Sequence, residues 1–167
     1  ILMLGSPCLW AQGKGSSSNL LSKMRGLMIS ADDSDSDMEA ETVDLRGHVQ
    51  IIFKDQHLSC DHARVNYRSK TIDAEGNVLL VGPKATVVSE KIYLDYESNS
   101  GVIYNGSVKS GSVYFEGAMI TRASETDYMA DKAKFTTCTN CPESWSFSGQ
   151  KIRAELGGYA YIKNSFL

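Results

Sequence analysis

The chain has 167 residues, of which 42% are hydrophobic, and a formal net charge of −3. This length suits one domain with a single buried core plus a tail. The 17 Lys and Arg residues form no basic run, which argues against a nucleic-acid partner. No apolar run reaches the roughly 18 residues that a membrane-spanning helix requires.

Residues 1–13 have the pattern of a partial signal peptide. An apolar segment, Ile1 to Leu4, and a second one around Leu9 and Trp10 precede the small residues Ala11 and Gly13, which suit a cleavage site. The initiating Met and the charged region before the apolar segment are absent, so we expect the sequence to begin inside the peptide. The segment therefore predicts an exported protein.

Residues 14–42 are predicted to form a Gly/Ser-rich and acidic linker without stable structure. The acidic run between Asp32 and Asp44 should be extended and solvated because its like charges repel. A calcium loop is the alternative, since Asp33, Asp35 and Asp37 have the spacing of its first ligands. Met38 argues against it, because it stands where the loop needs Gly.

From Val43 to the end, apolar and polar residues alternate in short segments, which is the period of a β-strand. The pattern recurs about every 29 residues, most clearly in the segments 59–64 and 89–92. Within each repeat the alternation slips by one residue, as at a β-bulge. Gly47, Gly76, Gly106 and Gly117 are assigned to unit ends, and Asn105-Gly106 to a hairpin turn.

No residue after Val43 belongs to a sustained helical pattern, so the fold class is all-β. We expect residues 43–167 to form an elongated, curled stack of two sheets made from short antiparallel strands. The inner face would be apolar and able to cover the acyl chains of a lipid, since each buried CH₂ group contributes about 0.8 kcal/mol. The alternative is that the same residues only form a closed core. The candidate lipid-binding residues are Val49, Ile51, Phe53, Val65, Tyr67, Val78, Leu80, Val87, Ile92, Leu94, Tyr104, Phe115, Phe135 and Phe147.

The polar residues form no recognisable catalytic pattern. His48, His57 and His62 all lie in the first repeat, and no Ser or carboxylate accompanies them in the order of a catalytic triad. We therefore expect neither an enzyme nor a cofactor.

The corner from Phe135 to Phe147 contains Cys138 and Cys141. A zinc site would need a second ligand pair, which is missing, and redox chemistry would need a following helix. Two disulfide options remain open: a local Cys138–Cys141 bond, or a bridge from this corner to a cysteine elsewhere. Cys60 is expected to be a buried thiol. We expect Trp145 and Phe147 to pack inward beside Phe135, and Thr136 and Thr137 to face solvent.

Three segments, Leu58 to Tyr67, Gly76 to Val78 and Ser89 to Tyr96, resemble the OstA-like repeat of lipopolysaccharide (LPS) transport proteins. The corner, with its Thr-Thr-Cys138 and Trp145-Ser-Phe147, is similar to the end of the N-terminal periplasmic domain in the LptD family of outer-membrane LPS-assembly proteins. The resemblance covers residues 43–167, and Cys141 departs from the family pattern.

The resemblance implies an OstA/LptA-like β-jellyroll that receives LPS on the periplasmic side of the outer membrane. The domain would pass the acyl chains through a hydrophobic groove to a β-barrel that begins after this sequence. It further implies a periplasmic bridge protein, and an outer-membrane lipoprotein as the partner of the barrel. Cys138 would bond to a cysteine near the end of that barrel. Because an edge strand presents unpaired N–H and C=O groups, we expect the bridge protein to pair with the first strand, between Val43 and Phe53.

Two other functions remain open. One is a soluble periplasmic LPS-bridge protein of the same fold, and the other is a structural β-solenoid adhesion module. A chain that continued into amphipathic strands would exclude the soluble bridge protein.

Overall fold

The computed structural model describes residues 26–137 and 146–166, and the regular structure in these ranges is entirely strand. The strands are β1 (Leu27–Ser30), β2 (Asp33–Asp37), β3 (Thr42–Phe53), β4 (Gln56–Asn66), β5 (Thr71–Val81), β6 (Thr86–Asp95), β7 (Ser100–Ser110), β8 (Val113–Arg122), β9 (Asp127–Thr136), β10 (Phe147–Glu155) and β11 (Ala160–Phe166). No helix in the described ranges is long and apolar enough to cross a membrane.

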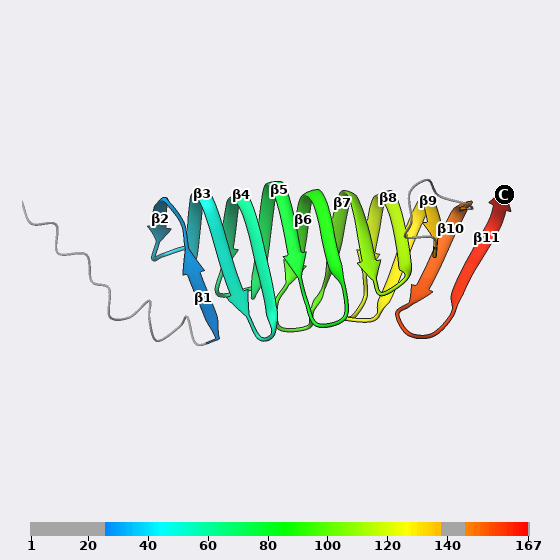
Figure 1. Cartoon of the computed structure of the whole chain (residues 1–167). Coiled ribbons are helices and arrows are strands. Elements are labelled where there is room, and N and C mark those ends of the chain that lie inside the picture. The colour runs from blue at the N-terminus through cyan, green and yellow to red at the C-terminus, as the bar shows by residue number, and fades with distance from the viewer. Residues whose placement is uncertain (1–25, 138–145, 167) are drawn as a thin grey trace, which may run out of the picture.

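All eleven strands belong to one antiparallel sheet (Figure 1). From β3 to β11 each strand pairs with the next one in the chain, while β1 and β2 both pair with β3. The expected all-β, elongated, antiparallel fold is therefore confirmed, but the strands belong to a single sheet and not to the two sheets that were expected. The strand that was expected to end in a turn at Asn105-Gly106 instead continues to Ser110 as one bent strand, β7.

The bend lies near the middle of each long strand. The pairing register shifts between Arg46 and Val49 in β3, and between Glu75 and Val78 in β5. At these two bends Gly47 and His48, and Gly76 and Asn77, have positive φ angles. Only glycine adopts such angles without strain. Figure 1 shows the strands curving over its upper margin, while most hairpin turns lie along the lower one.

The assignment of Gly47, Gly76, Gly106 and Gly117 to unit ends was wrong, and so was the prediction of a hairpin turn at Asn105-Gly106. Asn105 lies inside β7 with a φ of 45°, because a strand that crosses from one layer to the other needs the same backbone freedom as a turn. Side-chain pairs brace successive bends: Asp32 with His48, Asp61 with Asn77, and Glu90 with Asn105, each at 2.7 Å.

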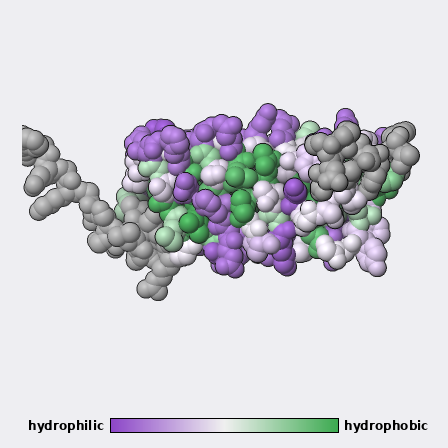
Figure 2. Space-filling model, in the orientation of Figure 1, coloured by the Kyte–Doolittle hydropathy of each residue, from purple (hydrophilic) through white to green (hydrophobic). Residues whose placement is uncertain are grey.

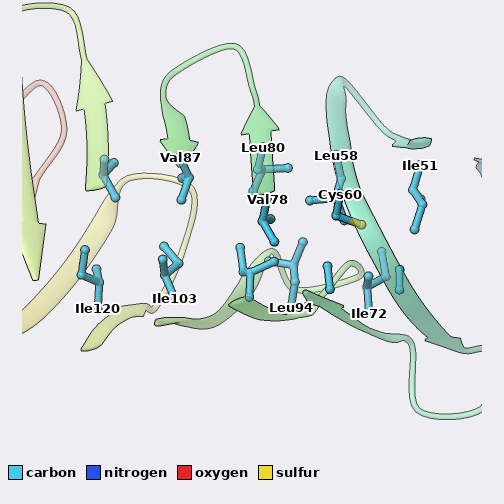
Figure 3. Close-up of a cluster of buried hydrophobic side chains, with 14 of the residues drawn as sticks. Ile51, Leu58, Cys60, Ile72, Val78, Leu80, Val87, Leu94, Ile103 and Ile120 are labelled. Atoms are coloured by element: carbon cyan, nitrogen blue, oxygen red, sulfur yellow. The ribbon is translucent and has the colours of Figure 1, made fainter. Parts of the chain in front are cut away.

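Bending folds the sheet into two layers. Layer 1 contains the segments 42–46, 62–66, 71–75, 91–95, 100–104, 119–122 and 127–131, and layer 2 contains the segments 49–53, 56–60, 78–81, 86–89, 106–110, 113–117 and 133–136. Figure 3 shows Ile51, Leu58 and Val78 of layer 2 facing Ile72, Leu94 and Ile103 of layer 1. The core therefore lies between the two inner faces.

Side chains with a constant spacing of about 29 residues close the turns of layer 1. Asp37, Asn66 and Asp95 each accept backbone N–H bonds from residues two and three positions later, and Ser124 Oγ accepts equivalent bonds from Thr126 and Asp127. Such side chains stabilise tight turns. The bonds from Ser98 and Glu97 also hold the pKa of the Asp95 carboxyl below its usual value.

The N-terminal boundary of the domain differs from the prediction. Segment 27–37 was assigned to an unstructured linker, but β1 pairs with residues 50–53 in layer 2 and β2 pairs with residues 42–46 in layer 1. The acidic residues of β2 are exposed and extended, as expected. They lie in a strand because backbone bonding to β3 and the pair between Asp32 and His48 offset their repulsion.

Candidate functional site

The space between the two layers is lined almost entirely by apolar side chains. Residues that alternate along each strand from β3 to β10 point inward, and most of them are fully buried. Outward neighbours such as Arg64 and Asp44 form ion pairs across the strands, with 2.8 Å between Arg64 Nε and Asp44 Oδ1. This bond holds the pKa of the Asp44 carboxyl below its usual value. The interior is thus one apolar layer that spans the length of the domain.

Most candidate lipid-binding residues point into this interior. Val49, Ile51, Phe53, Val65, Tyr67, Val78, Leu80, Val87, Ile92, Leu94, Phe115 and Phe135 are buried, and Phe147 is partly buried against the same core. Tyr104 was placed wrongly: it is 39% exposed, and its neighbour Ile103 points inward instead. The cause is the bend at Asn105, which the sequence pattern did not distinguish from a turn.

Several inward residues were missed, although the same alternation identifies them. They are Leu45, Leu58, Ile72, Val108, Ile120, Tyr128 and Ile152. The Tyr128 ring packs edge-on against the Phe115 ring from the opposite layer, with 5.6 Å between their centroids. Burial raises the pKa of Tyr128. Together these residues extend the apolar interior through β8, β9 and β10.

Most inward-facing side chains are fully buried against one another. Hollows of about 620 and 660 Å³ lie on outer surfaces, one lined by Met119, Met129 and Tyr161, the other beside the bends at Asn77 and Asn105. The outer faces also carry hydrophobic residues, as Figure 2 shows near the middle of the face in view. A lipid chain that enters the interior therefore needs the two layers to move apart.

The two layers meet a second time along the edge opposite the bends, which we call the seam. Its margins are the turns of layer 1 (38–41, 67–70, 96–99 and 123–126) and the turns of layer 2 (54–55, 82–85 and 111–112). Lys54 Nζ donates a 2.8 Å hydrogen bond across it to the carbonyl oxygen of Glu97. The rings of Phe53 and Tyr96 also face each other across it, with 6.5 Å between centroids.

A buried polar cluster joins the margins near the middle of the seam. Gln56 Nε2 donates to Asn99 Oδ1 at 3.1 Å, and Arg122 donates to Gln56 Oε1 at 3.0 Å. Asn99 Nδ2 donates to Glu125 Oε1 at 2.8 Å. Gln56 comes from layer 2, and the other three residues come from the layer 1 margin. We call this group the clasp; its members are too far apart in the chain for a sequence pattern to reveal it.

The structure also places three other residues that the sequence analysis singled out, namely Cys60, His48 and His57. Cys60 is a buried free thiol, as expected. His48 is exposed, and its bond to Asp32 raises the pKa of its imidazole. His57 lies in β4. Among residues 26–137 and 146–166, no group of three or more His, Cys, Asp or Glu side chains is placed to hold a metal ion.

The corner is only partly described. Phe135 and Phe147 pair across β9 and β10 and pack on the core, as expected. Thr136 was expected to face solvent but is buried, whereas Thr137 is exposed. Cys138, Cys141 and Trp145 lie outside the described residues, as does the predicted signal peptide 1–13.

Comparisons with known proteins agree with this architecture. The chain is 26% identical over 119 residues to the LPS-assembly protein LptD of Nitrosomonas eutropha, a match that covers 70% of this chain and 16% of the relative. It is 24% identical over 111 residues to LptD of Shewanella denitrificans, covering 65% of this chain and 14% of the relative. The chain therefore spans about a sixth of the length of these curated relatives.

The fold is also similar to a solved structure, that of LptH, described as the LptA homologous periplasmic component of the lipopolysaccharide transport device from Pseudomonas aeruginosa. The TM-score is 0.59 at 14% identity, and the match covers 71% of this chain and 87% of LptH. The family model described as "LptA/(LptD N-terminal domain) LPS transport protein" matches residues 28–157. The chain thus belongs to the LptA/LptD N-terminal domain family of LPS transport proteins.

Proposed function

We propose that this domain is a non-catalytic periplasmic carrier of lipopolysaccharide at the outer membrane. It receives LPS and passes the acyl chains between its two layers toward an outer-membrane β-barrel. The observation that carries the proposal is the continuous apolar interior, which every strand from β3 to β10 lines. Membership of an LPS transport family supports it, as do relatives that are LPS-assembly proteins.

The physical task of such a carrier is to keep acyl chains out of water. A twelve-carbon chain left in water costs on the order of 9 kcal/mol, at about 0.8 kcal/mol per CH₂ group. The inner faces offer aliphatic side chains such as Ile51, Ile92 and Ile103, all fully buried. Acyl chains that replace the contacts between layers keep these side chains in an apolar environment. Transport then needs no chemical step from the protein.

Photo-crosslinking tests the path of the lipid. A photoreactive amino acid at Ile51 or Leu94, which point inward, should capture LPS in cells that transport it. The same residue at Val88 or Tyr93, which point outward from the same two layers, should capture little. Both pairs lie in the middle of the domain, so they differ mainly in the face they occupy. Equal capture on both faces would contradict transport through the interior.

We further propose that an OstA-like bridge protein pairs with an edge strand. The edge predicted between Val43 and Phe53 was wrong, because β1 and β2 pair with that strand. Within the described residues, β1 and β2 form the N-terminal edge and β11 forms the other. An edge strand presents unpaired N–H and C=O groups that a partner strand can bond. We therefore propose that the bridge protein docks on β1 and β2.

Proline substitution in β1 tests this docking site. Consecutive N–H groups of a strand point to opposite sides, so one of Met28→Pro and Ile29→Pro removes a donor that faces away from β3. That variant should lose the bridge complex and keep the fold, as measured by pull-down and circular dichroism. Proline at Ala160, the first residue of β11 at the far edge, is the control. If both β1 variants bind normally, the bridge protein docks elsewhere.

A further inference from the structure

The clasp places a cation at a position where the rest of the inner face is apolar. Arg122 follows the inward-facing Ile120 on β8, and its side chain is only 5% exposed. Gln56 precedes the inward-facing Leu58 on β4 and is 3% exposed. Both residues stand at the seam ends of their layers. A lipid that entered through the seam would pass these polar groups before reaching the apolar interior.

The partners of the Arg122 guanidinium are neutral. It donates to Gln56 Oε1 at 3.0 Å and to the Ser124 carbonyl oxygen at 3.3 Å, and it lies 6.0 Å from the centroid of the Tyr128 ring. No carboxylate among the described residues forms an ion pair with it, and Glu125 is bonded to Asn99 instead. A buried cation without a counter-charge retains much of its desolvation cost. An anion could offset that cost.

Two further features favour an anion at this point. Lys84 from layer 2 lines a cavity of about 10 Å³ together with Gln56, Arg122 and Glu125; the cavity has room for no more than a water molecule until the layers separate, but it brings a second cation to this point. Lys54 lies in the turn immediately before Gln56 and already bonds across the seam. The guanidinium fork matches the oxygens of a phosphate better than an amide does. Glu125 opposes an anion, and its bond to Asn99 directs it toward the layer 1 turns.

We propose that the clasp is the latch of a lateral entrance along the seam, and that Arg122 binds the phosphate of a phosphorylated acyl lipid as it enters. The phosphate replaces Gln56 on the guanidinium, which removes one of the two hydrogen bonds by which Gln56 links layer 2 to layer 1. The acyl chains then pass beneath Arg122 into the interior, and the headgroup stays at the seam. This assignment rests on the proposed function, since it concerns the same lipid path.

Binding measurements on the full chain test the phosphate site. The probes are lipid A, dephosphorylated lipid A and inorganic phosphate. The wild-type protein should prefer lipid A over its dephosphorylated form by roughly ten- to a hundredfold, the range of a charge-assisted bond. Arg122→Met should bind both lipids equally. Arg153→Met, which removes an exposed arginine of the same layer, should keep the preference, and Glu125→Gln should increase it.

A second variant tests the latch without any lipid and serves if Arg122→Met does not fold. Gln56→Met keeps the side-chain volume at position 56 and leaves Arg122 in place, but it removes both hydrogen bonds of the Gln56 amide. Amide hydrogen exchange should accelerate at least about tenfold at the seam, around Leu58 and Asn99, and stay unchanged at the bends near Asn77, because local opening exposes only the seam. Uniform acceleration, or none, would overturn the latch.

The outcomes separate the two proposals. If the wild type binds both lipids with equal affinity, or Arg122→Met keeps the preference, the phosphate site is wrong and the carrier function stands. Inorganic phosphate that binds as tightly as lipid A would show an anion site unrelated to lipid entry, which also overturns the assignment. If the wild type binds neither lipid, the carrier function itself is contradicted.

Discussion

Leu94→Asp should unfold the domain, whereas Tyr93→Asp at the adjacent position should leave it folded. Leu94 is fully buried between the layers, and Tyr93 on the opposite face is 44% exposed. An unpaired carboxylate at the buried position costs several kcal/mol, a large part of the roughly 5–15 kcal/mol that stabilises a domain of this size. The exposed substitution should change stability by about 1 kcal/mol or less.

Urea denaturation followed by circular dichroism measures both variants. The pair isolates the face of the strand, because the two positions share their neighbours in the chain and the same introduced residue. Similar losses of stability at both positions would mean that the layers do not enclose the core as described.

The Cys60 thiol should react far more slowly in the native protein than in the unfolded one. Burial is the main factor that raises the pKa of Cys60 to about 11, and the adjacent Asp61 carboxylate adds to it. At pH 8 the native thiol is then ionised roughly a hundredfold less than a thiol with the ordinary pKa of 9.0. Mass spectrometry of the Cys60 peptide after timed alkylation measures the ratio, and equal rates in both states would contradict the burial.

The raised pKa of Cys60 also determines how the stability of the domain changes at alkaline pH. Because the native pKa lies above the unfolded value, the native state keeps its proton longer than the unfolded chain does. The stability contributed by Cys60 is therefore complete below about pH 9 and decreases as the pH rises toward 11. Tyr67, whose pKa is raised to about 12 mainly by burial, extends the loss upward. Denaturation midpoints should decline across this range.

The alternation of apolar and polar residues alone predicted most of the inward-facing positions, because buried and exposed residues alternate along the strands. In β3 and β5 the buried positions follow one parity from end to end, so Val49, Ile51, Val78 and Leu80 were assigned correctly to the inner face. Tyr104 was misassigned because β7 bends at Asn105, and its alternation shifts there. A glycine or asparagine with positive φ suits a bend and a turn equally, so the residue type could not separate them.

The sequence pattern could not predict contacts between residues that are far apart in the chain. Gln56, Asn99 and Arg122 look like isolated polar residues in the chain, and only the two-layer fold brings them together. The acidic run was similarly misjudged, because its exposed carboxylates gave no sign that the backbone of β2 pairs with β3. The turn-closing residues Asp37, Asn66, Asp95 and Ser124 did carry a signal in their constant spacing. They mark the true turns better than the glycines did.

Contacts between acyl-chain protons and isoleucine methyl groups test the central claim most directly. Ile51 and Ile52 are neighbours in β3, but Ile51 is fully buried and Ile52 is 40% exposed on the outer face. In a complex of the methyl-labelled protein with LPS, we predict nuclear Overhauser effects from acyl chains to Ile51, Ile92 and Ile103. Acyl-chain contacts that fall on Ile52 and leave the inward isoleucines unchanged would show that the lipid binds outside the two layers.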